Sequence, residues 1–585
     1  MLVKTYASAV QGIEALTVTI EADVSPGLNF HLVGLPDSAV RESLQRIATA
    51  VQSVGMRIPG KRIVINMAPA DIRKEGSAYD LPLALAILAA SEQMDSSLLE
   101  GTLCMGELAL DGTLRPVRGA LSMALHAKEE SFERCVFPLD SAKEAAVVDG
   151  LQVYGVTHLA QVLDLMHGHP GISPLSSDLP PDQPPDQPPD QPLDFPPDQP
   201  DDLSPDEPFD LSSNLPPDQS PNLPPGLGKE HGPGSVPGSS YPDFAQVRGQ
   251  AQARRALEVA AAGGHNVLMT GPPGAGKTFM ARCLPGILPL LTRAEAIETT
   301  RIWSVAGIPR KEQGLMRFRP FRAPHHTASI VSLTGGGAHA RPGEISLAHN
   351  GVLYLDELPE FSTAALEVLR QPLEDGTIRI SRAGYKVDYP ARFMLVASMN
   401  PCPCGFYGHP SRDCVCVPYQ IRRYENKISG PLRDRIDIHL MVKAVDVEDL
   451  IAGVGVQVGA QSGSRSHSAS RSQSASRSQP ASRSQSQPEC SDAIRRRVEQ
   501  ARSIQLERFR ETQHLHTNAQ IPVELLPVYC PLDAPCRSFL KQVLERLHLS
   551  ARAHHRILRL ARTIADLEGS EHVQMQHLAE AVQYK

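Results

Sequence analysis

The stretch Asn266-Val-Leu-Met-Thr-Gly-Pro-Pro-Gly-Ala-Gly-Lys-Thr278 decides the fold of the central part of this 585-residue chain. It joins a short apolar run to a glycine-rich loop, and helix-compatible residues 279–284 follow. Glycines let backbone amides turn toward phosphate oxygens, a lysine ammonium reaches those oxygens, and a threonine hydroxyl coordinates Mg²⁺ at the start of a helix. The stretch therefore predicts a strand, a loop and a helix that bind ATP and Mg²⁺ through Gly271, Pro272, Pro273, Gly274, Ala275, Gly276, Lys277 and Thr278.

Two later apolar runs supply the residues that such a loop needs. Residues 351–357 predict a buried strand that delivers Asp356 to the metal and Glu357 to an attacking water. Residues 392–400 predict a third strand that ends in Asn400, which we expect to lie between the other two strands and to orient the water. The alternative for Asn400 is a residue that only caps a turn.

The segment Ser429-Gly-Pro-Leu-Arg-Asp-Arg-Ile-Asp437 carries arginines where the γ-phosphate of a neighbouring subunit could be met. An arginine supplied from a neighbouring subunit stabilises charge in the transition state and requires several copies to assemble. The sequence thus favours an oligomeric enzyme.

Composition divides the chain into three folded parts and two low-complexity segments. Residues 1–172 predict an α+β or α/β domain, with strands at 16–20, 62–67 and 103–108 and helices at 38–54, 81–91 and 120–129. Residues 241–450 interleave strands and helices as parallel α/β sheets do, and residues 490–585 are helical in pattern. Residues 173–240, rich in Pro, Asp and Gln, and 451–489, rich in Ser, Arg and Gln, predict disordered linkers, with a ligand for an SH3-type domain as the alternative for the first.

Charge and hydropathy exclude several classes of protein. The segment 174–240 holds 13 acidic residues and one lysine, and the segment 461–488 holds four arginines and no acid, so the rest of this net −8 chain is neutral. Any site for a polyanion must therefore be local. The longest apolar run, 81–90, is about half of what a bilayer requires, and no signal-peptide pattern opens the chain. We expect a soluble, cytoplasmic protein.

Four cysteines crowd into residues 402–416. Cys402 and Cys404, then Cys414 and Cys416, offer four thiolates, which suits a structural tetrahedral Zn²⁺. Free thiols or a disulfide are the alternatives, and His409 could replace one ligand. A catalytic metal is disfavoured because four sulfurs leave no open position.

Five strings in the central part are distinctive: Arg319-Pro-Phe-Arg-Ala-Pro-His-His326, Gly335-Gly-Gly337, Pro342-Gly-Glu-Ile-Ser-Leu-Ala-His349, Leu355-Asp-Glu-Leu-Pro-Glu-Phe361 and Asn400-Pro-Cys-Pro-Cys-Gly405. Through them the chain resembles the YifB/ComM family of magnesium-chelatase-like AAA+ ATPases, and the resemblance covers all three folded parts.

The resemblance implies a P-loop core with an insertion in helix 2 and a hairpin before the third strand, a C-terminal helical lid and a hexameric ring. It further implies ATP-driven branch migration of DNA in recombination during natural transformation, in the cytoplasm of a bacterium and alongside recombination proteins. Arg435 becomes the arginine finger, and Arg552 becomes the lid arginine that contacts nucleotide, with Arg556 as the competing candidate. His325 and His326 are expected to contact DNA or to support the insertion.

Residues 376–389 predict two strands around a glycine turn, and the resemblance implies that this hairpin projects into the pore of the ring. Arg379, Arg382 and Lys386 are then expected to contact DNA phosphates, and Tyr385 to stack on a base. A plain solvated hairpin is the alternative.

The N-terminal part resembles Lon-protease-type domains through residues 70–85, Ala-Asp-Ile-Arg-Lys-Glu-Gly-Ser-Ala-Tyr-Asp-Leu-Pro-Leu-Ala-Leu. A Lon-type peptidase needs a serine two residues after Gly76 and a lysine base within the segment 116–123. This chain has Ala78 and no lysine there, and Ser77 is out of register. Because the nucleophile and the base are both missing, we expect a non-proteolytic domain that acts as a scaffold or a DNA platform.

Together these features predict an ATP-driven ring motor that acts on DNA and promotes branch migration or unwinding. The main alternative is a chelatase-type ATPase that remodels a protein partner for metal insertion. A non-enzymatic adaptor is disfavoured because Lys277, Thr278, Asp356 and Glu357 are all present.

Overall fold

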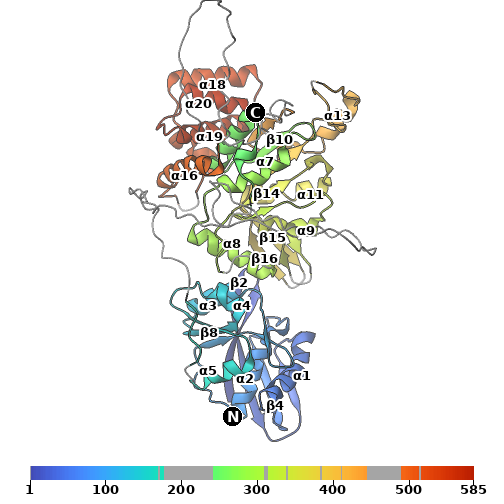
Figure 1. Cartoon of the computed structure of the whole chain (residues 1–585), viewed down its shortest axis with the longest axis vertical. Helices are drawn as coiled ribbons and strands as arrows, with labels where there is room; N and C mark the ends of the chain where they lie inside the picture. Colours follow the sequence, from blue (N-terminus) through green and yellow to red (C-terminus); the bar gives the residue numbers. More distant parts are fainter. Residues whose placement is uncertain are drawn as a thin grey trace, which may run out of the picture. The chain divides into compact units, whose positions relative to one another are not determined.

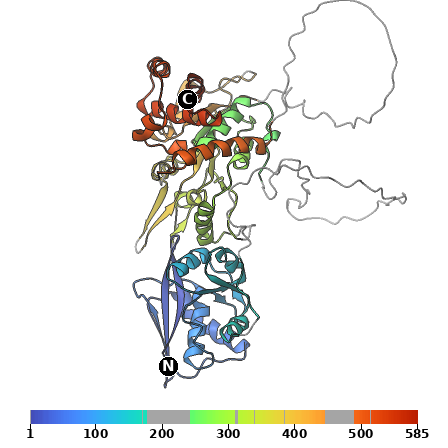
Figure 2. The ribbon, with the colours of Figure 1, turned by 90° about the vertical axis from the view of Figure 1, so that its left-hand side faces the viewer.

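The computed structural model describes residues 2–168, 171–176, 241–308, 314–337, 340–382, 385–409, 411–444, 489–512 and 515–585 (Figures 1 and 2). Three of the predicted stretches lie outside these ranges in whole or in large part. They are residues 177–240 of the predicted linker at 173–240, residues 445–450 at the end of the predicted ATPase core, and residues 451–488 of the predicted insertion. The described parts form a mixed α/β protein.

The N-terminal part is built on a seven-stranded sheet in the order β3-β4-β2-β1-β5-β8-β9. The pairs β1–β2 and β2–β4 are antiparallel, and the remaining pairs are parallel. The strands are β1 (Leu2–Gln11), β2 (Glu14–Ser25), β3 (Phe30–Val33), β4 (Arg62–Ala68), β5 (Thr102–Cys104), β8 (Arg134–Pro138) and β9 (Gln152–Val156), and β6 (Glu107–Leu108) pairs with β7 (Leu114–Arg115) outside this sheet.

Five helices complete this part: α1 (Ser38–Ser53), α2 (Asp80–Ala90), α3 (Ala120–Glu129), α4 (Leu139–Ala145) and α5 (Leu159–Met166). Every residue of α2 is buried, and from Leu81 onward its sequence is apolar on all sides, as a helix covered all round requires. The predicted strand at 103–108 is wrong in extent, because the chain leaves the sheet after Cys104. The amide of Gly106 then donates to the carbonyl of Ala78 instead of to a strand.

The central part holds a five-stranded sheet in the order β11-β14-β17-β10-β18, and all of its strand pairs are parallel. This confirms the predicted parallel α/β core. It also confirms that the strand ending before Asn400 lies between the other two. The strands are β10 (Val267–Thr270), β11 (Phe321–Arg322), β14 (Val352–Leu355), β17 (Met394–Met399) and β18 (Ile438–Met441). Buried residues fill β14 and β17, as expected of strands covered on both faces.

The helices around this sheet are α6 (Ala251–Gly263), α7 (Lys277–Cys283), α8 (Arg293–Ala306), α11 (Thr363–Glu367), α12 (Arg370–Asp375), α13 (Pro418–Glu425) and α14 (Gly430–Arg433). Between α8 and β14 the chain forms α9 (Ile330–Thr334), the strand pair β12 (Gly335–Gly336) and β13 (Arg341–Pro342), and α10 (Glu344–Leu347).

The predicted hairpin before the third strand is present as β15 (Thr377–Arg382) and β16 (Tyr385–Pro390), paired antiparallel. Ile378, Ile380, Val387 and Tyr389 are buried in the apolar cluster of the central part. The hydroxyl of Tyr389 donates to the carbonyl of Ala340 at 2.9 Å. The hairpin is therefore packed on the segment that precedes β13, and it is not solvated on both faces.

The C-terminal part is helical, as predicted, and comprises α16 (Ser491–Arg508), α17 (Leu526–Tyr529), α18 (Ala534–Arg546), α19 (Ala551–Leu567) and α20 (Met575–Gln583). Its apolar faces share one buried cluster with α6 and β10, as Leu257, Val267 and Ile564 illustrate. The buried imidazole of His265 adds a polar link, with Nδ1 3.2 Å from Asp437 and Nε2 2.8 Å from the Thr563 hydroxyl. Within the described ranges no helix is long and apolar enough to cross a membrane.

Candidate nucleotide-binding site and cysteine cluster

The loop between β10 and α7 has the backbone geometry that a phosphate-binding loop requires. Gly274 and Gly276 have φ angles of 78° and 82°, which only glycine adopts without strain. A Cβ atom on Gly271 would lie 2.3 Å from the carbonyl oxygen of Val442. These glycines therefore allow the loop to turn sharply and to pack against the chain after β18.

Lys277 is the first residue of α7, and its ammonium is folded back on the loop. Its Nζ donates to the carbonyls of Gly271 at 2.6 Å and Pro272 at 2.9 Å, and to Oδ1 of Asn400 at 3.2 Å. Burial lowers the pKa of Lys277, and the nearby carboxylates of Asp356 and Glu357 oppose this shift. Phosphate oxygens would be stronger acceptors than these neutral groups, because they carry charge.

Asp356 lies next to Thr278 at the carboxyl end of β14. The Thr278 hydroxyl donates to Oδ2 of Asp356 at 2.8 Å, and the Ser398 hydroxyl donates to Oδ1. Burial raises the pKa of Asp356, but the hydrogen bonds from Ser398 and Thr278 outweigh it, so the net shift is downward. An ionised carboxylate beside a hydroxyl at a helix start is the donor set that Mg²⁺ takes in nucleotide sites.

Sequence reasoning missed two residues of this network, Tyr354 and Ser398. The Tyr354 hydroxyl donates to Thr278 at 3.2 Å and to Ser398 at 3.1 Å. Each lies on a strand, two positions before the predicted site residue that directly follows that strand, Tyr354 before Asp356 and Ser398 before Asn400. Because side chains alternate along a strand, this spacing was the available signal.

The backbone of Glu357 has an unusual conformation, which sets the direction of its side chain. Its φ is 52°, in the left-handed region, and its amide donates to Oδ1 of Asp356 at 3.1 Å. The side chain is 53% exposed, and its Oε2 lies 3.6 Å from Nδ1 of His326. The ring of His325 lies 4.1 Å from that of His326, centroid to centroid. The histidine pair thus lies beside the predicted catalytic carboxylate.

The predicted finger and lid arginines gather on the segment before β18. Arg435 donates to the carbonyl of Pro431 at 2.8 Å and forms an ion pair with Glu374, and its side chain is only 19% exposed. Arg552 pairs with Asp434 at 2.9 Å, and Arg556 donates to the carbonyl of Ile436 at 2.6 Å. These contacts within the described chain do not bring any of the three arginines to the phosphate-binding loop.

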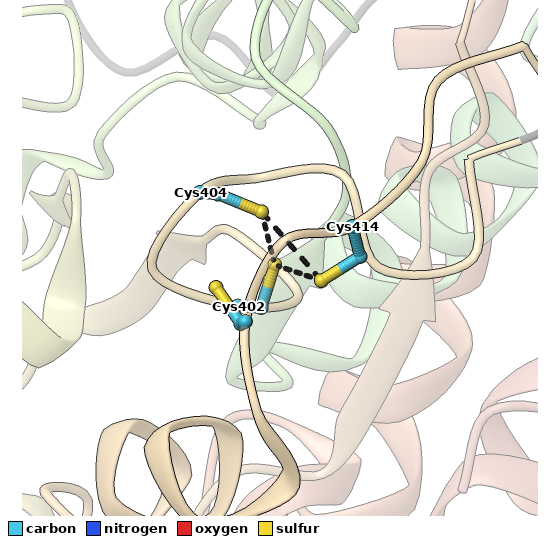
Figure 3. Close-up of side chains that lie close together, drawn as sticks. Cys402, Cys404 and Cys414 are labelled. Atoms are coloured by element: carbon cyan, nitrogen blue, oxygen red, sulfur yellow. Dashed lines mark hydrogen bonds between the residues drawn. The ribbon is translucent and has the colours of Figure 1, made fainter.

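The four cysteines predicted to bind zinc come together after Asn400, and Figure 3 labels three of them, Cys402, Cys404 and Cys414. Their sulfur atoms all lie within 4.8 Å of one another, and the Cys402 sulfur is 3.3 Å from Cys404 and 3.6 Å from Cys414. All four thiols are free, so the disulfide alternative is not realised here.

This arrangement fits a tetrahedral metal ion. Four sulfurs at about 2.3 Å from Zn²⁺ would lie about 3.8 Å apart, close to the separations seen. A hydrogen bond from the Phe406 backbone lowers the pKa of Cys404 to about 6, whereas burial and the neighbouring thiols of Cys404 and Cys402 raise the pKa of Cys414 and of Cys416. His409 hydrogen bonds to Ser411 instead, with its Nδ1 3.2 Å from the Ser411 amide.

The hairpin only partly agrees with the predicted DNA contacts. Arg379 forms a two-pronged ion pair with Asp388 on the opposite strand, at 2.8 and 2.9 Å, so its charge is compensated. Lys386 is exposed. Arg382 and Tyr385 pair in register, but their side chains lie outside the part of the structure that is described.

The N-terminal region that resembles a peptidase has its polar groups engaged in structural contacts. The Ser77 hydroxyl bonds to Glu107, and Nζ of the buried Lys74 bonds to the carbonyl of Pro69. Buried Asp80 accepts from Arg46 at 2.8 and 2.9 Å. Among the described residues, no hydrogen bond joins Ser77 to a lysine.

Comparison with known proteins agrees with this geometry. Residues 243–450 match the family profile "Magnesium chelatase, subunit ChlI", residues 20–141 match "Subunit ChlI of Mg-chelatase", and residues 488–585 match "Magnesium chelatase, subunit ChlI C-terminal". The chain is 37% identical to competence protein ComM of Haemophilus influenzae, over 99% of this chain and 96% of that protein. It is 36% identical to the uncharacterized protein YifB of Escherichia coli with the same coverage. Its likeness to the magnesium-chelatase 67 kDa subunit of Heliobacterium mobile, 29% identical, covers 28% of this chain and 29% of that one.

The parallel sheet, the glycine loop with Lys277 and the adjacent Asp356 define a magnesium-chelatase-like ATPase of the AAA+ type, a class that uses ATP and Mg²⁺. Because the similarity to ComM and YifB extends over almost the full length of both chains, the protein belongs to the YifB/ComM family of that class.

Proposed function

We propose that this protein is an ATP-driven ring motor that acts on DNA and promotes branch migration or unwinding during homologous recombination in natural transformation. This proposal is preferred over the alternative because of how much of the chain each group of relatives matches. One relative matched over 99% of this chain is named a competence protein, whereas a magnesium-chelatase subunit matches 28% of it. The alternative, a chelatase-type ATPase that remodels a protein partner, draws its support from the second comparison.

In the proposed hydrolysis, Lys277 leaves the carbonyls of Gly271 and Pro272 and binds the phosphate oxygens of ATP. Thr278 and Asp356 would hold Mg²⁺, which would neutralise charge on the phosphates. Glu357 orients and polarises the attacking water. Asn400, whose Oδ1 lies 3.2 Å from the Lys277 ammonium, helps to orient the same water.

The ring arises because the finger acts between subunits. Arg435 is proposed to stabilise the transition state in a neighbouring subunit of a homo-hexamer, and a ring of six copies forms six such sites. This requires Arg435 to exchange its partner Glu374 for a phosphate of the neighbour. In the proposed lid, Arg552 contacts nucleotide, with Arg556 as the competing candidate.

Contact with DNA is assigned to the hairpin β15–β16. Lys386 is exposed and available to phosphates, and Arg382 adjoins the turn. Arg379 contributes only if it gives up Asp388, so we expect it to be the weakest of the three. The contacts are with backbone phosphates, which carry no base sequence.

Two further assignments concern structure. We propose that Cys402, Cys404, Cys414 and Cys416 bind one structural Zn²⁺, and that the N-terminal part is a non-proteolytic Lon-type domain. In support, the sulfurs have tetrahedral spacing, and the Ser77 hydroxyl bonds to Glu107.

The test measures ATP hydrolysis by the full-length protein with and without single-stranded, duplex and branched DNA. DNA should accelerate hydrolysis, and wild type should shift a three-strand junction in an ATP-dependent way. Combined replacement of Arg379, Arg382 and Lys386 by alanine should keep basal hydrolysis and lose both effects. Replacing exposed Arg537 and Lys541 on α18 by glutamine is the matched control.

The two candidate functions give opposite results in this experiment. A chelatase-type ATPase that remodels a protein partner does not need DNA for its hydrolysis of ATP. Hydrolysis and junction position that do not respond to DNA at low salt would reject the DNA motor and support protein remodelling.

A further inference from the structure

The cysteine cluster displays an apolar edge to solvent. Cys414 and Cys416 turn their sulfurs into the cluster (Cys414 is labelled in Figure 3), while the residues that alternate with them face outward. Val415 is 83% exposed and Val417 is 54% exposed. Side chains alternate in direction along an extended segment, so when Cys414 and Cys416 point into the cluster, Val415 and Val417 must point to solvent.

Helix α13 continues this edge directly. Tyr419, Arg422 and Arg423 are spaced i, i+3 and i+4, so they share one face of the helix, and all three are exposed, Tyr419 by 72%. Tyr424 is on the buried side. We call Val415, Val417, Tyr419, Arg422 and Arg423 the 415–423 surface.

The charge on this surface is uncompensated. Neither the Arg422 nor the Arg423 guanidinium lies within ion-pair distance of a carboxylate anywhere in the described ranges, in contrast to Arg379, which is held by Asp388. Two free guanidinium groups beside an exposed aromatic ring and two apolar side chains are complementary to a chain that carries both phosphates and flat bases.

We infer that the 415–423 surface is a binding site for single-stranded nucleic acid, additional to the hairpin. Arg422 and Arg423 pair with successive backbone phosphates, and Tyr419 stacks on a base whose apolar edge rests on the valines. This inference rests on the proposed function, which names DNA as the polymer that the motor moves along.

The position of the surface links such a site to ATP hydrolysis. Tyr424, under α13, lies in the same buried cluster as Met399, the residue before Asn400. At the start of the cysteine loop, a Cβ atom on Gly405 would lie 2.8 Å from Pro273 of the phosphate-binding loop. Packed residues therefore connect the 415–423 surface to the strand end at Asn400 and the cysteine loop to the phosphate-binding loop.

The test uses full-length protein with ATP and compares wild type with Arg422→Gln/Arg423→Gln and with Tyr419→Ala. Fluorescence anisotropy of a labelled oligothymidine is followed from about 50 to 200 mM salt. Loss of two phosphate contacts should lower the slope of log affinity against log salt by about 1.4 and weaken binding about tenfold at low salt. Tyr419→Ala should weaken binding about fivefold or more and leave the slope unchanged, because stacking releases no counterions.

The control is Arg537→Gln/Lys541→Gln, which removes two exposed positive charges elsewhere. Oligomer mass, metal content and basal ATP hydrolysis are measured for every variant and should match wild type. Unchanged affinity and slope in both test variants, with wild type binding normally, would overturn this site alone. A change in oligomer mass would overturn it and assign the surface to a contact between subunits. Failure of wild type to bind the oligonucleotide would reject the proposed DNA motor itself.

Discussion

Removing the Ser398 hydroxyl tests whether Asp356 is tuned as a metal ligand. Ser398 donates to Oδ1 of Asp356, while Thr278 donates to Oδ2. A hydrogen bond to a charged group contributes about 1.5–3 kcal/mol. We take the lower end, because the Thr278 hydroxyl and the Glu357 amide still donate in Ser398→Ala.

Loss of the Ser398 hydrogen bond makes the ionised carboxylate of Asp356 less stable. A free-energy change of about 1.4 kcal/mol corresponds to a tenfold change in an equilibrium constant. Ser398→Ala should therefore raise the Mg²⁺ concentration for half-maximal ATP hydrolysis about tenfold. The pKa of Asp356 is lowered in the folded protein, so its ionised form is lost as pH falls through that value. Without Ser398 this pKa rises, and the acid limb of the pH–rate profile should move toward neutral pH.

The assay is a titration of hydrolysis with Mg²⁺ at several pH values. Ser346→Ala is the matched control, because the Ser346 hydroxyl is also buried but has no hydrogen-bond partner within the described residues. Its removal should leave the Mg²⁺ response unchanged. An identical Mg²⁺ requirement in wild type and Ser398→Ala, or an equal defect in Ser346→Ala, would refute the tuning of Asp356.

Three further predictions concern the nucleotide site, the metal and assembly. Lys277→Ala should abolish nucleotide binding, whereas Glu357→Gln should bind ATP and hydrolyse it very slowly, because the phosphate loop stays intact; equal turnover of wild type and Glu357→Gln would contradict the role of that carboxylate. Purified protein should contain about one zinc per chain by metal analysis, and Cys402→Ser with Cys414→Ser should remove it; four titratable thiols without metal would end that assignment. Mixing Arg435→Ala subunits with Glu357→Gln subunits should restore some hydrolysis at mixed interfaces, and a monomeric ATPase independent of concentration would exclude a finger acting in trans.

Much of the nucleotide site could be predicted because its parts are contiguous. The loop from Gly271 to Thr278 is one segment, and its backbone path depends on glycines whose φ angles the structure confirms at Gly274 and Gly276. The strand before Asp356 and the strand before Asn400 are buried along their whole length and are apolar apart from the hydroxyls of Tyr354 and Ser398, which is the pattern of central parallel strands. Local pattern was sufficient wherever neighbouring residues in the sequence act together.

Side-chain networks were harder to predict because they join distant residues. The contact of Ser398 with Asp356 spans 42 positions, and that of Tyr354 with Thr278 spans 76. The ion pair of Arg379 with Asp388 also escaped sequence reasoning, because the register of a hairpin decides which residues face each other. A basic residue in a hairpin was therefore counted as free when it is paired.

By itself, the sequence determined the nucleotide loop, the parallel class of the central sheet, the helical C-terminal part and the cysteine group. Each of these depends on spacing along the backbone, which covalent geometry and side-chain periodicity control. Only the tertiary structure decided which charges remain free, since Arg379 is compensated whereas Arg422 and Arg423 are not. It also decided that Arg435 is held by Glu374, 61 positions away. Such pairings depend on distances between elements, and a sequence pattern carries no information about a distance until the chain has packed.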